Sequence, residues 1–321
     1  MFIGVDHGTV GIRFAVLKGG EGDRVTVFEL SRKKAADMDS EEIITEVEKG
    51  LKIKTEEIKL IAMTYSMGDD FSTIKDIKKV RNRGIRNEKA GSTVGGGTKV
   101  FDAIKNAGIP TIMIPGIHAD SEKIDRRMKF FSHCASPEKV GVAYYIYKKG
   151  FKSFVFADIS SNTVTMSVVR GIIIGAIDAC LGSPGLYQGP IDLQLLRDIE
   201  DGRISANDAF SNAGVVRKKW TKAGGGEELA LDTLSLFAAM EISAMLVLMR
   251  DYGVEASLAS DCKIFLTGSV GEKEEMKRRI NQLLGVEAGT LTRYSAAIGC
   301  AAIAKDVFYG EKNILGIRVE L

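Results

Sequence analysis

Two segments of this 321-residue chain share one design, and each is expected to form a strand, a loop of small residues and a second strand. The first segment spans residues 2–17 and the second spans residues 154–169. In both, an apolar run ends in an aspartate, Asp6 or Asp158, and a β-rich run follows the loop. A third β-rich run comes after each pair. This internal repeat predicts two related α/β units within one chain.

The two loops have the residue types of an anion site. A buried strand that ends in a carboxylate, followed by Gly, Ser and Thr, brings backbone N–H groups and hydroxyls close to a phosphate. The carboxylates of Asp6 and Asp158 are then expected to hold Mg²⁺, directly or through water. Either aspartate alone is more often a turn residue, and the duplication favours the functional interpretation. The phosphate is expected to be held by Gly8, Thr9, Ser160, Ser161 and Asn162.

Two residues beside the first loop have roles that the sequence leaves open. Arg13 either caps a strand edge or reaches the bound phosphate or a carboxylate. His7 lies within the loop and is expected to face the ligand, with its chemical role undecided.

Composition limits the partners and the location. Forty-four Lys and Arg against 42 Asp and Glu leave a net charge of +2, which does not indicate nucleic-acid binding. The four cysteines have neither zinc-site nor redox-motif spacing and are typical of a reducing cytoplasm. The apolar stretch 234–249 is short for a membrane span and contains Glu241. The sequence therefore predicts a cytoplasmic protein without a signal peptide, a nucleic-acid partner or a membrane partner.

Periodicity and capping signals predict mixed strands and helices along the whole chain. We expect two domains, residues 1–146 and 151–294, with the C-terminal segment 295–321 packing back on the first as a helix. Expected helices are 40–49, 98–106, 138–149, 193–199, 206–210, 228–252, 272–284 and 295–308, and expected strands include 58–66, 111–115 and 263–267, with a tight loop at 268–271.

Five segments, in order, resemble the motifs of the superfamily that contains acetate kinase, sugar kinases, Hsp70 and actin. The resemblance implies two ribonuclease H-like (actin-like ATPase) domains with a nucleotide cleft between them, and it implies ATP and Mg²⁺ as cofactors. It also places Gly268, Ser269 and Gly271 beside the adenosine. The segments are Gly4–Arg13 and Ala157–Thr163 for the two phosphate motifs, Leu266–Gly271 for the adenosine motif, and Val140–Tyr144 and Ala296–Ala302 for the two hinge helices.

Within that superfamily the chain is most similar to the methanogenesis marker 12 family, uncharacterised acetate/butyrate-kinase-like proteins of methanogenic archaea. The first loop and the segments 136–141 and 182–193 carry this resemblance. The second loop departs from the superfamily pattern, because Ser160, Ser161 and Asn162 stand where two or more glycines are usual. Side chains restrict backbone approach, so either hydroxyls replace N–H contacts or the phosphate binds more weakly.

Two polar regions are candidates for a substrate site. The basic run 75–89 precedes the glycine-rich segment 91–99, and together they form either a solvated surface or an anion site at a helix N-terminus. A cluster of His, Asp and Arg follows at 118–133, with a spacing that does not suit metal binding. The substrate-binding residues proposed from these regions are Arg86, His118, Arg126 and His133.

The leading hypothesis is an ATP-dependent kinase that transfers a phosphoryl group to a small, carboxylate-bearing acceptor. Asp6, Arg13 and Asp158 would form its catalytic set. One alternative is a nucleotide-gated assembly or activator ATPase, and another is a nucleotide-binding protein without catalysis. The sequence leaves open the identity of the acceptor and whether the chain forms a homodimer.

Overall fold

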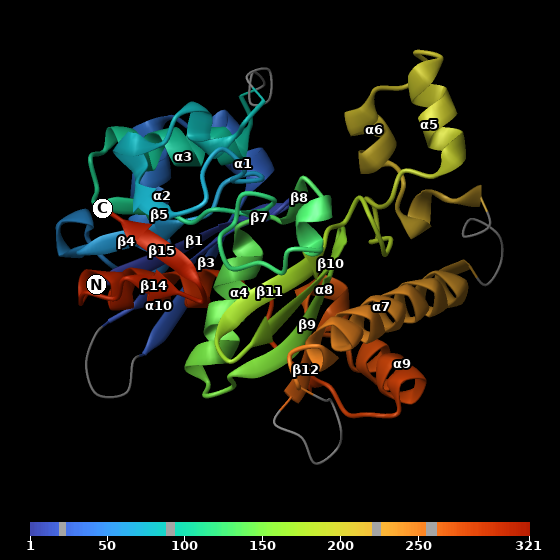
Figure 1. Cartoon of the computed structure of the whole chain (residues 1–321). Helices are drawn as coiled ribbons and strands as arrows, with labels where there is room; N and C mark the ends of the chain where they lie inside the picture. Colours follow the sequence, from blue (N-terminus) through green and yellow to red (C-terminus); the bar gives the residue numbers. More distant parts are fainter. Residues whose placement is uncertain (19–23, 88–93, 220–225, 255–261) are drawn as a thin grey trace. The chain divides into compact units, whose positions relative to one another are not determined.

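The computed structural model describes residues 1–18, 24–87, 94–219, 226–254 and 262–321. The chain divides into two compact units, one made of Met1–Gly150 with Tyr294–Leu321 and the other of Phe151–Arg293 (Figure 1). Each unit contains a sheet with helices packed against it, so the predicted α/β class is confirmed.

The first unit is built on an eight-stranded sheet in the order β14-β15-β5-β6-β4-β1-β2-β3. β1, β2 and β3 are antiparallel, whereas β4 and β6 run parallel to β1. Every residue of β1 is buried, as expected for a strand covered on both faces. The strands are β1 Phe2–His7, β2 Gly11–Leu17, β3 Val25–Ser31, β4 Leu60–Met63, β5 Ile74–Asp76, β6 Thr111–Met113, β14 Asn313–Ile314 and β15 Ile317–Glu320, with β7 Ile117–His118 and β8 His133–Ala135 forming a separate pair.

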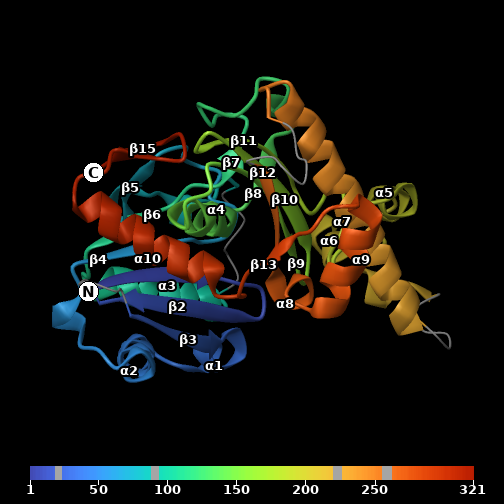
Figure 2. The same ribbon diagram turned by 90° about the horizontal axis from the view of Figure 1, so that it is seen from below.

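Helices cover both faces of this sheet (Figure 2). Successive residues of β1 face opposite sides of the sheet and therefore contact different helices. Gly4 lies against α10, where a Cβ would be 1.9 Å from the Ala297 carbonyl oxygen. The neighbouring residues Ile3 and Val5 face α2 and α3 instead. The helices are α1 Arg32–Asp37, α2 Ser40–Leu51, α3 Gly96–Asn106, α4 Glu138–Lys148 and α10 Ser295–Phe308, with 3₁₀ turns at Thr55–Glu57, Ile77–Lys79, Asn82–Gly84 and Met128–Phe130.

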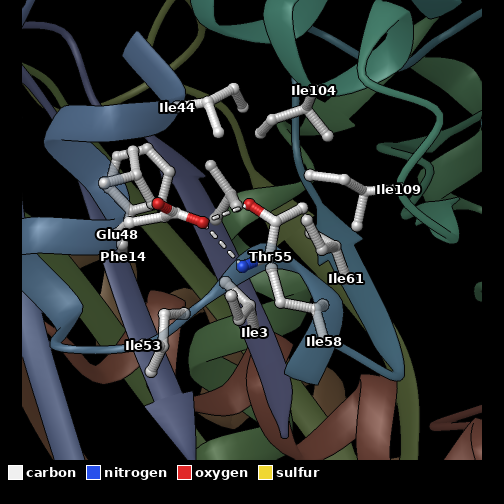
Figure 3. Close-up of a pocket in the computed structure, with 12 residues that line it drawn as sticks. Ile3, Phe14, Ile44, Glu48, Ile53, Thr55, Ile58, Ile61, Ile104 and Ile109 are labelled. Atoms are coloured by element: carbon white, nitrogen blue, oxygen red, sulfur yellow. Dashed lines mark hydrogen bonds between the residues drawn. The ribbon is translucent and has the colours of Figure 1, made fainter. Parts of the chain in front are cut away.

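A small apolar cavity lies between the sheet and the helices α2 and α3 (Figure 3). Its walls are almost entirely aliphatic and aromatic side chains. The two polar residues at its edge satisfy each other, because the N–H and hydroxyl of Thr55 donate to Glu48 Oε1 at 2.7 and 2.6 Å. This lining offers no donor to a phosphate, so the cavity belongs to the packing of the core.

The second unit repeats the topology of the first around a five-stranded sheet in the order β11-β10-β9-β12-β13. β9, β10 and β11 are antiparallel and β12 is parallel to β9, as β4 is to β1. The duplicated hairpins therefore occupy equivalent places in two sheets. The strands are β9 Ser153–Ile159, β10 Thr163–Val169, β11 Ile172–Ile177, β12 Cys262–Thr267 and β13 Gly289–Thr290.

The long helix α7 packs on β9 and β10 through a face that includes Ala238, Ile242 and Met245. Among the described residues it is the one helix whose length and composition would also suit a membrane span, a test that core helices of globular domains pass as well. The helices of this unit are α5 Leu193–Glu200, α6 Ala206–Ser211, α7 Gly226–Arg250, α8 Gly268–Gly271 and α9 Glu274–Leu284, with a 3₁₀ turn at Val215–Arg217.

Two predicted elements need correction. The segment 268–271, predicted as a tight loop, forms the helical turn α8. The C-terminal segment 295–321 is not one helix, because α10 ends at Phe308 and Gly310 adopts a left-handed backbone conformation with φ of 105°. The residues beyond it form β14 and β15, and β15 pairs with β5.

Candidate functional site

Asp6 and Arg13 form an ion pair at the base of the first loop. They are register partners on β1 and β2, and Arg13 Nη1 lies 3.1 Å from Asp6 Oδ2. Arg13 Nε also lies 3.7 Å from Glu29 Oε2 on β3. The sequence left several roles open for Arg13, and in the structure its side chain reaches carboxylates. Gly8 allows the loop to fold over this pair, since a Cβ there would lie 3.0 Å from Arg13 Nη1.

His7 is buried, so the prediction that it faces a ligand is wrong. Only 8% of it is exposed, and its ring lies edge-on to Tyr65 with the centroids 5.2 Å apart. Burial first and Arg32 second lower the pKa of His7 to about 3, against the opposite influence of the Thr64 and Gly97 carbonyls. The physical reason is strand alternation: because Asp6 points toward one face of the sheet, His7 points toward the other.

The second loop is a compact turn after Asp158. The Ser160 N–H donates to the Asn162 carbonyl at 2.8 Å, and the Ser160 hydroxyl donates to Asp158 Oδ1 at 3.3 Å. The Asn162 side chain donates to Gln188 Oε1 at 3.2 Å, which ties the loop to a distant segment. Asp158, Ser160, Ser161 and Asn162 are all half-buried.

The structure brings the segment Gly268–Gly271 against this second loop. Thr267 and Asp158 are register partners on the parallel strands β12 and β9, so the carboxyl ends of both strands meet. Gly268 has φ of 90°, and a Cβ there would lie 2.3 Å from Asp158 Oδ1. Gly271 lies over Ile159, and Ser269 is exposed.

Sequence reasoning missed three buried or half-buried residues of the first unit: Cys300, which interacts electrostatically with Asp6, and the pair Glu138 and Lys139 at the start of α4. The Cys300 thiol on α10 is fully buried, and its pKa is raised by burial and then by the carboxylates of Asp6 and Glu138. Lys139, which is 3% exposed, pairs with Glu138 at 3.0 Å. The Ser-Pro-Glu signal indicated the start of α4, and no local pattern distinguished these side chains from ordinary helix-start residues.

Three of the four residues proposed to bind a substrate contact Asp120 or backbone carbonyl groups. Arg86 pairs with Asp120 at 2.7 Å, and His118 Nε2 lies 3.0 Å from the Phe71 carbonyl oxygen. Burial is the largest cause that lowers the pKa of His118. His133 Nε2 lies 3.2 Å from the carbonyl oxygen of Met67.

Arg126 is exposed, as Arg86 is, but its side chain forms no hydrogen bond or ion pair within the described residues. Residues 91–93 of the predicted anion segment 91–99 lie outside the described residues, as does Lys89. Within the described ranges no three His, Cys, Asp or Glu side chains gather as a metal site.

Glu241 on α7 binds Ser183, close in sequence to residues 185–188, which contact the second loop. The sequence identified Glu241 only as a polar residue within an apolar stretch. It is 6% exposed, its Oε2 accepts the Thr165 hydroxyl at 2.7 Å and its Oε1 accepts the Ser183 N–H at 2.5 Å. Burial raises the pKa of Glu241 to about 7, with Asp178 adding to the rise and the two hydrogen bonds opposing it.

This carboxyl predicts a pH-dependent stability. Between the ordinary pKa of 4.5 and about 7 the folded state binds more protons than the unfolded state, so stability falls as pH rises through that window. The full loss is on the order of 3 kcal/mol. We expect the free energy of unfolding of Glu241→Gln, measured in urea at pH 5 and pH 8, to change less between the two pH values than that of the native chain. The control Glu227→Gln, on an exposed position of α7, should keep the native pH dependence.

The fold is shared with kinases of small carboxylic acids. Acetate kinase of Porphyromonas gingivalis superposes with a TM-score of 0.58 over 95% of this chain and 98% of its own, at 11% sequence identity. A propionate kinase of Francisella tularensis gives 0.54 over 95% and 98%, at 13% identity. A ROK family glucokinase of Streptomyces griseus, in complex with glucose and AMPPNP, gives 0.50 over 95% and 99%, at 12% identity. The chain therefore has the two-domain fold of the acetate kinase, sugar kinase and actin superfamily.

Full-length relatives define the family. A UPF0285 protein of Methanosarcina mazei is 52% identical over 331 aligned positions, which cover 99% of both chains. A UPF0285 protein of Methanocaldococcus jannaschii is 41% identical over 339 positions, covering 99% of this chain and 98% of its own. This chain belongs to the UPF0285 family, and no family model matches it.

Proposed function

We propose that this chain is a nucleotide-binding phosphotransferase that acts on a small acceptor bearing a carboxylate, within the methanogenesis marker 12 type of the superfamily. The observation that carries the proposal is the pair of equivalent loops, one after Asp6 in β1 and one after Asp158 in β9. The acetate and propionate kinases that share the fold supply the reaction class and the type of acceptor.

The donors in the two loops fit a polyphosphate. In the described chain the N–H groups of Gly8, Thr9, Ser161 and Asn162 donate to no protein acceptor. Phosphate oxygens accept such backbone donors. The glucokinase that shares the fold is in complex with AMPPNP, a nucleotide whose phosphate oxygens can accept such backbone donors.

Mg²⁺ fits the carboxylates only in its usual hydrated form. It keeps several waters and binds through one or two carboxylates together with substrate phosphates, and Asp6 and Asp158 offer one carboxylate each.

The chain's own groups would bind and orient the reactants. Bound Mg·ATP supplies the phosphoryl group. Asp6 and Asp158 would orient the hydrated metal, Arg13 would hold Asp6 in place, and the two loops would fix the phosphates. Gly268, Ser269 and Gly271 are proposed to lie beside the adenosine.

A second candidate, a nucleotide-gated ATPase whose output is a conformational change, is favoured by the engagement of the predicted acceptor residues. Arg86 already pairs with Asp120, and the rings of His118 and His133 contact backbone carbonyl oxygens. Arg126 is the exposed cation that remains for an anionic acceptor among the four proposed residues.

Turnover with candidate acceptors distinguishes the two functions. The kinase requires that a carboxylic acid raises ATP consumption above basal hydrolysis and that Arg126→Met lowers this increase with little change in ATP affinity. Arg127→Met is the matched control, since Arg127 pairs with Asp125 at 2.9 Å. A flat response to carboxylates, together with ATP-dependent compaction in solution scattering, would overturn the kinase in favour of the nucleotide-gated protein.

A further inference from the structure

Arg32, at the start of α1, binds the first loop through the carbonyl groups of that loop. Arg32 Nε donates to the Gly8 carbonyl at 2.8 Å, and Arg32 Nη2 donates to the His7 carbonyl at 3.3 Å. The Arg32 N–H donates to the Val10 carbonyl at 3.1 Å. A single residue thus binds three carbonyl groups of one loop. No carboxylate of the described chain forms an ion pair with Arg32, so these carbonyls are its partners.

The second loop is held in the same way by a backbone turn, residues 185–188. The Leu186 N–H donates to the Ser160 carbonyl at 2.9 Å. The N–H groups of Tyr187 and Gln188 both donate to the Ser161 carbonyl, at 3.0 and 2.9 Å.

Residues 214–216 fix this turn on its other side. The N–H groups of Gly214, Val215 and Val216 donate to the carbonyls of Tyr187, Gly185 and Leu186 at 2.9, 3.0 and 3.2 Å. The turn 185–188 therefore lies between the second loop and 214–216, hydrogen-bonded to both, and it has little freedom to move away.

Holding the carbonyls determines where the amides point. A trans peptide is planar, with its N–H opposite to its C=O, and the chain has no cis peptide in its described part. The bonds to His7 and Gly8 therefore direct the N–H groups of Gly8 and Thr9 away from Arg32. The bonds to Ser160 and Ser161 likewise direct the N–H groups of Ser161 and Asn162 away from the turn. Within the described residues, these four N–H groups donate to no protein acceptor.

We propose that Arg32 and the turn 185–188 are positioning elements that direct these four amides at the phosphate oxygens of a nucleoside triphosphate. The inference rests on the proposed function and deepens it, because it assigns the phosphate chain, rather than the nucleoside, to both loops. Donors fixed before binding need no reorganisation when the anion arrives. The turn also explains how Ser160, Ser161 and Asn162 serve where glycines are usual: an external brace sets the backbone orientation.

Gly185 provides the test in the second unit. A Cβ at this position would lie 2.2 Å from Asn162 Cα and 2.4 Å from the Ser161 carbonyl oxygen, so Gly185→Ala forces the turn off the loop. We expect Mg·ATP and inorganic triphosphate to bind about tenfold more weakly in calorimetry, with adenosine unchanged. Gly189→Ala is the matched control, because its Cβ meets nothing closer than Pro184 Cα at 3.2 Å.

Arg32 provides an independent test in the first unit. We expect Arg32→Met to lose about tenfold in triphosphate affinity, with adenosine affinity unchanged. Arg32→Lys should lose less, because its ammonium still donates to a carbonyl group, but it should not match arginine, because it has no planar fork that binds two carbonyls. Lys33→Met, at the exposed neighbouring position, should bind all three ligands like the native chain.

The outcomes separate this inference from the proposed function. A native chain that binds neither Mg·ATP nor adenosine overturns the proposed function. A native chain that binds both, with ratios of triphosphate to adenosine affinity unchanged in Arg32→Met and Gly185→Ala, overturns the positioning role alone. Thermal unfolding without ligand identifies a variant that fails to fold. If Arg32→Met or Gly185→Ala fails in this way, the affinity ratio of the other variant tests the positioning role.

Discussion

Replacing Gly299 by valine is expected to lower the free energy of unfolding by about 4 kcal/mol or more, which is an exceptional loss for one substitution. The backbones of α4 and α10 touch at this point. A Cβ at Gly299 would lie 1.8 Å from the Gly141 carbonyl oxygen, and a Cβ at Gly141 would lie 2.6 Å from the Ala296 carbonyl oxygen. The obstructing atoms belong to helix backbone, so relief requires that the two helices separate.

Urea unfolding and soluble yield measure this effect. Ala302→Val is the matched control, since Ala302 is half-buried one turn further along α10, and its change should stay within about 1 kcal/mol. Amide exchange should show loss of protection in β1 and α10, while β9 and β10 of the second unit keep theirs. An unchanged unfolding midpoint for Gly299→Val would show that the contact between α4 and α10 is not tight in solution.

The repeated hairpins were predictable because long, buried strands have clear patterns. The runs that end in Asp6 and Asp158 became β1 and β9 with the expected antiparallel partners. Short strands have no such signal. β5 and β15 contain three and four residues, and their pairing joins segments far apart in sequence, as does the bond from Thr73 Oγ1 to Glu320 Oε2 at 3.0 Å. Only the folded chain brings these residues together.

The candidate site was predictable to the extent that it follows from strand ends and small residues. The residue types in the two loops indicated the chemistry, but nothing local indicates that Arg32, 24 residues after Gly8, binds its carbonyl. The turn 185–188 acts on the second loop through backbone N–H groups, which every non-proline residue has, so its side chains give no signal. His7 was misjudged because loop proximity was weighed above strand alternation.

Replacing Asp6 by asparagine is expected to weaken Mg·ATP binding by roughly 10- to 100-fold, the range for one hydrogen bond to a charged group, while adenosine affinity changes less than about twofold. Asp6 is 2% exposed and sits at the end of β1, beside Gly8 and Thr9. Asparagine keeps the shape of the side chain and can accept a bond from Arg13, whereas alanine would take from the half-buried Arg13 the nearer of its two carboxylates, at 3.1 Å. Asparagine therefore separates the charge from the packing.

Glu29→Gln is the control that makes this binding test specific. Glu29 is the other carboxylate on Arg13, at 3.7 Å, but it lies on β3 and not at the end of a strand beside the loop. If the charge of Asp6 acts on the hydrated metal, Glu29→Gln should leave Mg·ATP affinity within about twofold of the native value. Calorimetry with Mg·ATP, ATP in EDTA and adenosine gives the contrast: only the magnesium-bound nucleotide should lose affinity strongly in Asp6→Asn. Equal losses for Mg·ATP and adenosine, or equal losses in both variants, would assign Asp6 to the structure of the Arg13 ion pair and remove it from the metal site.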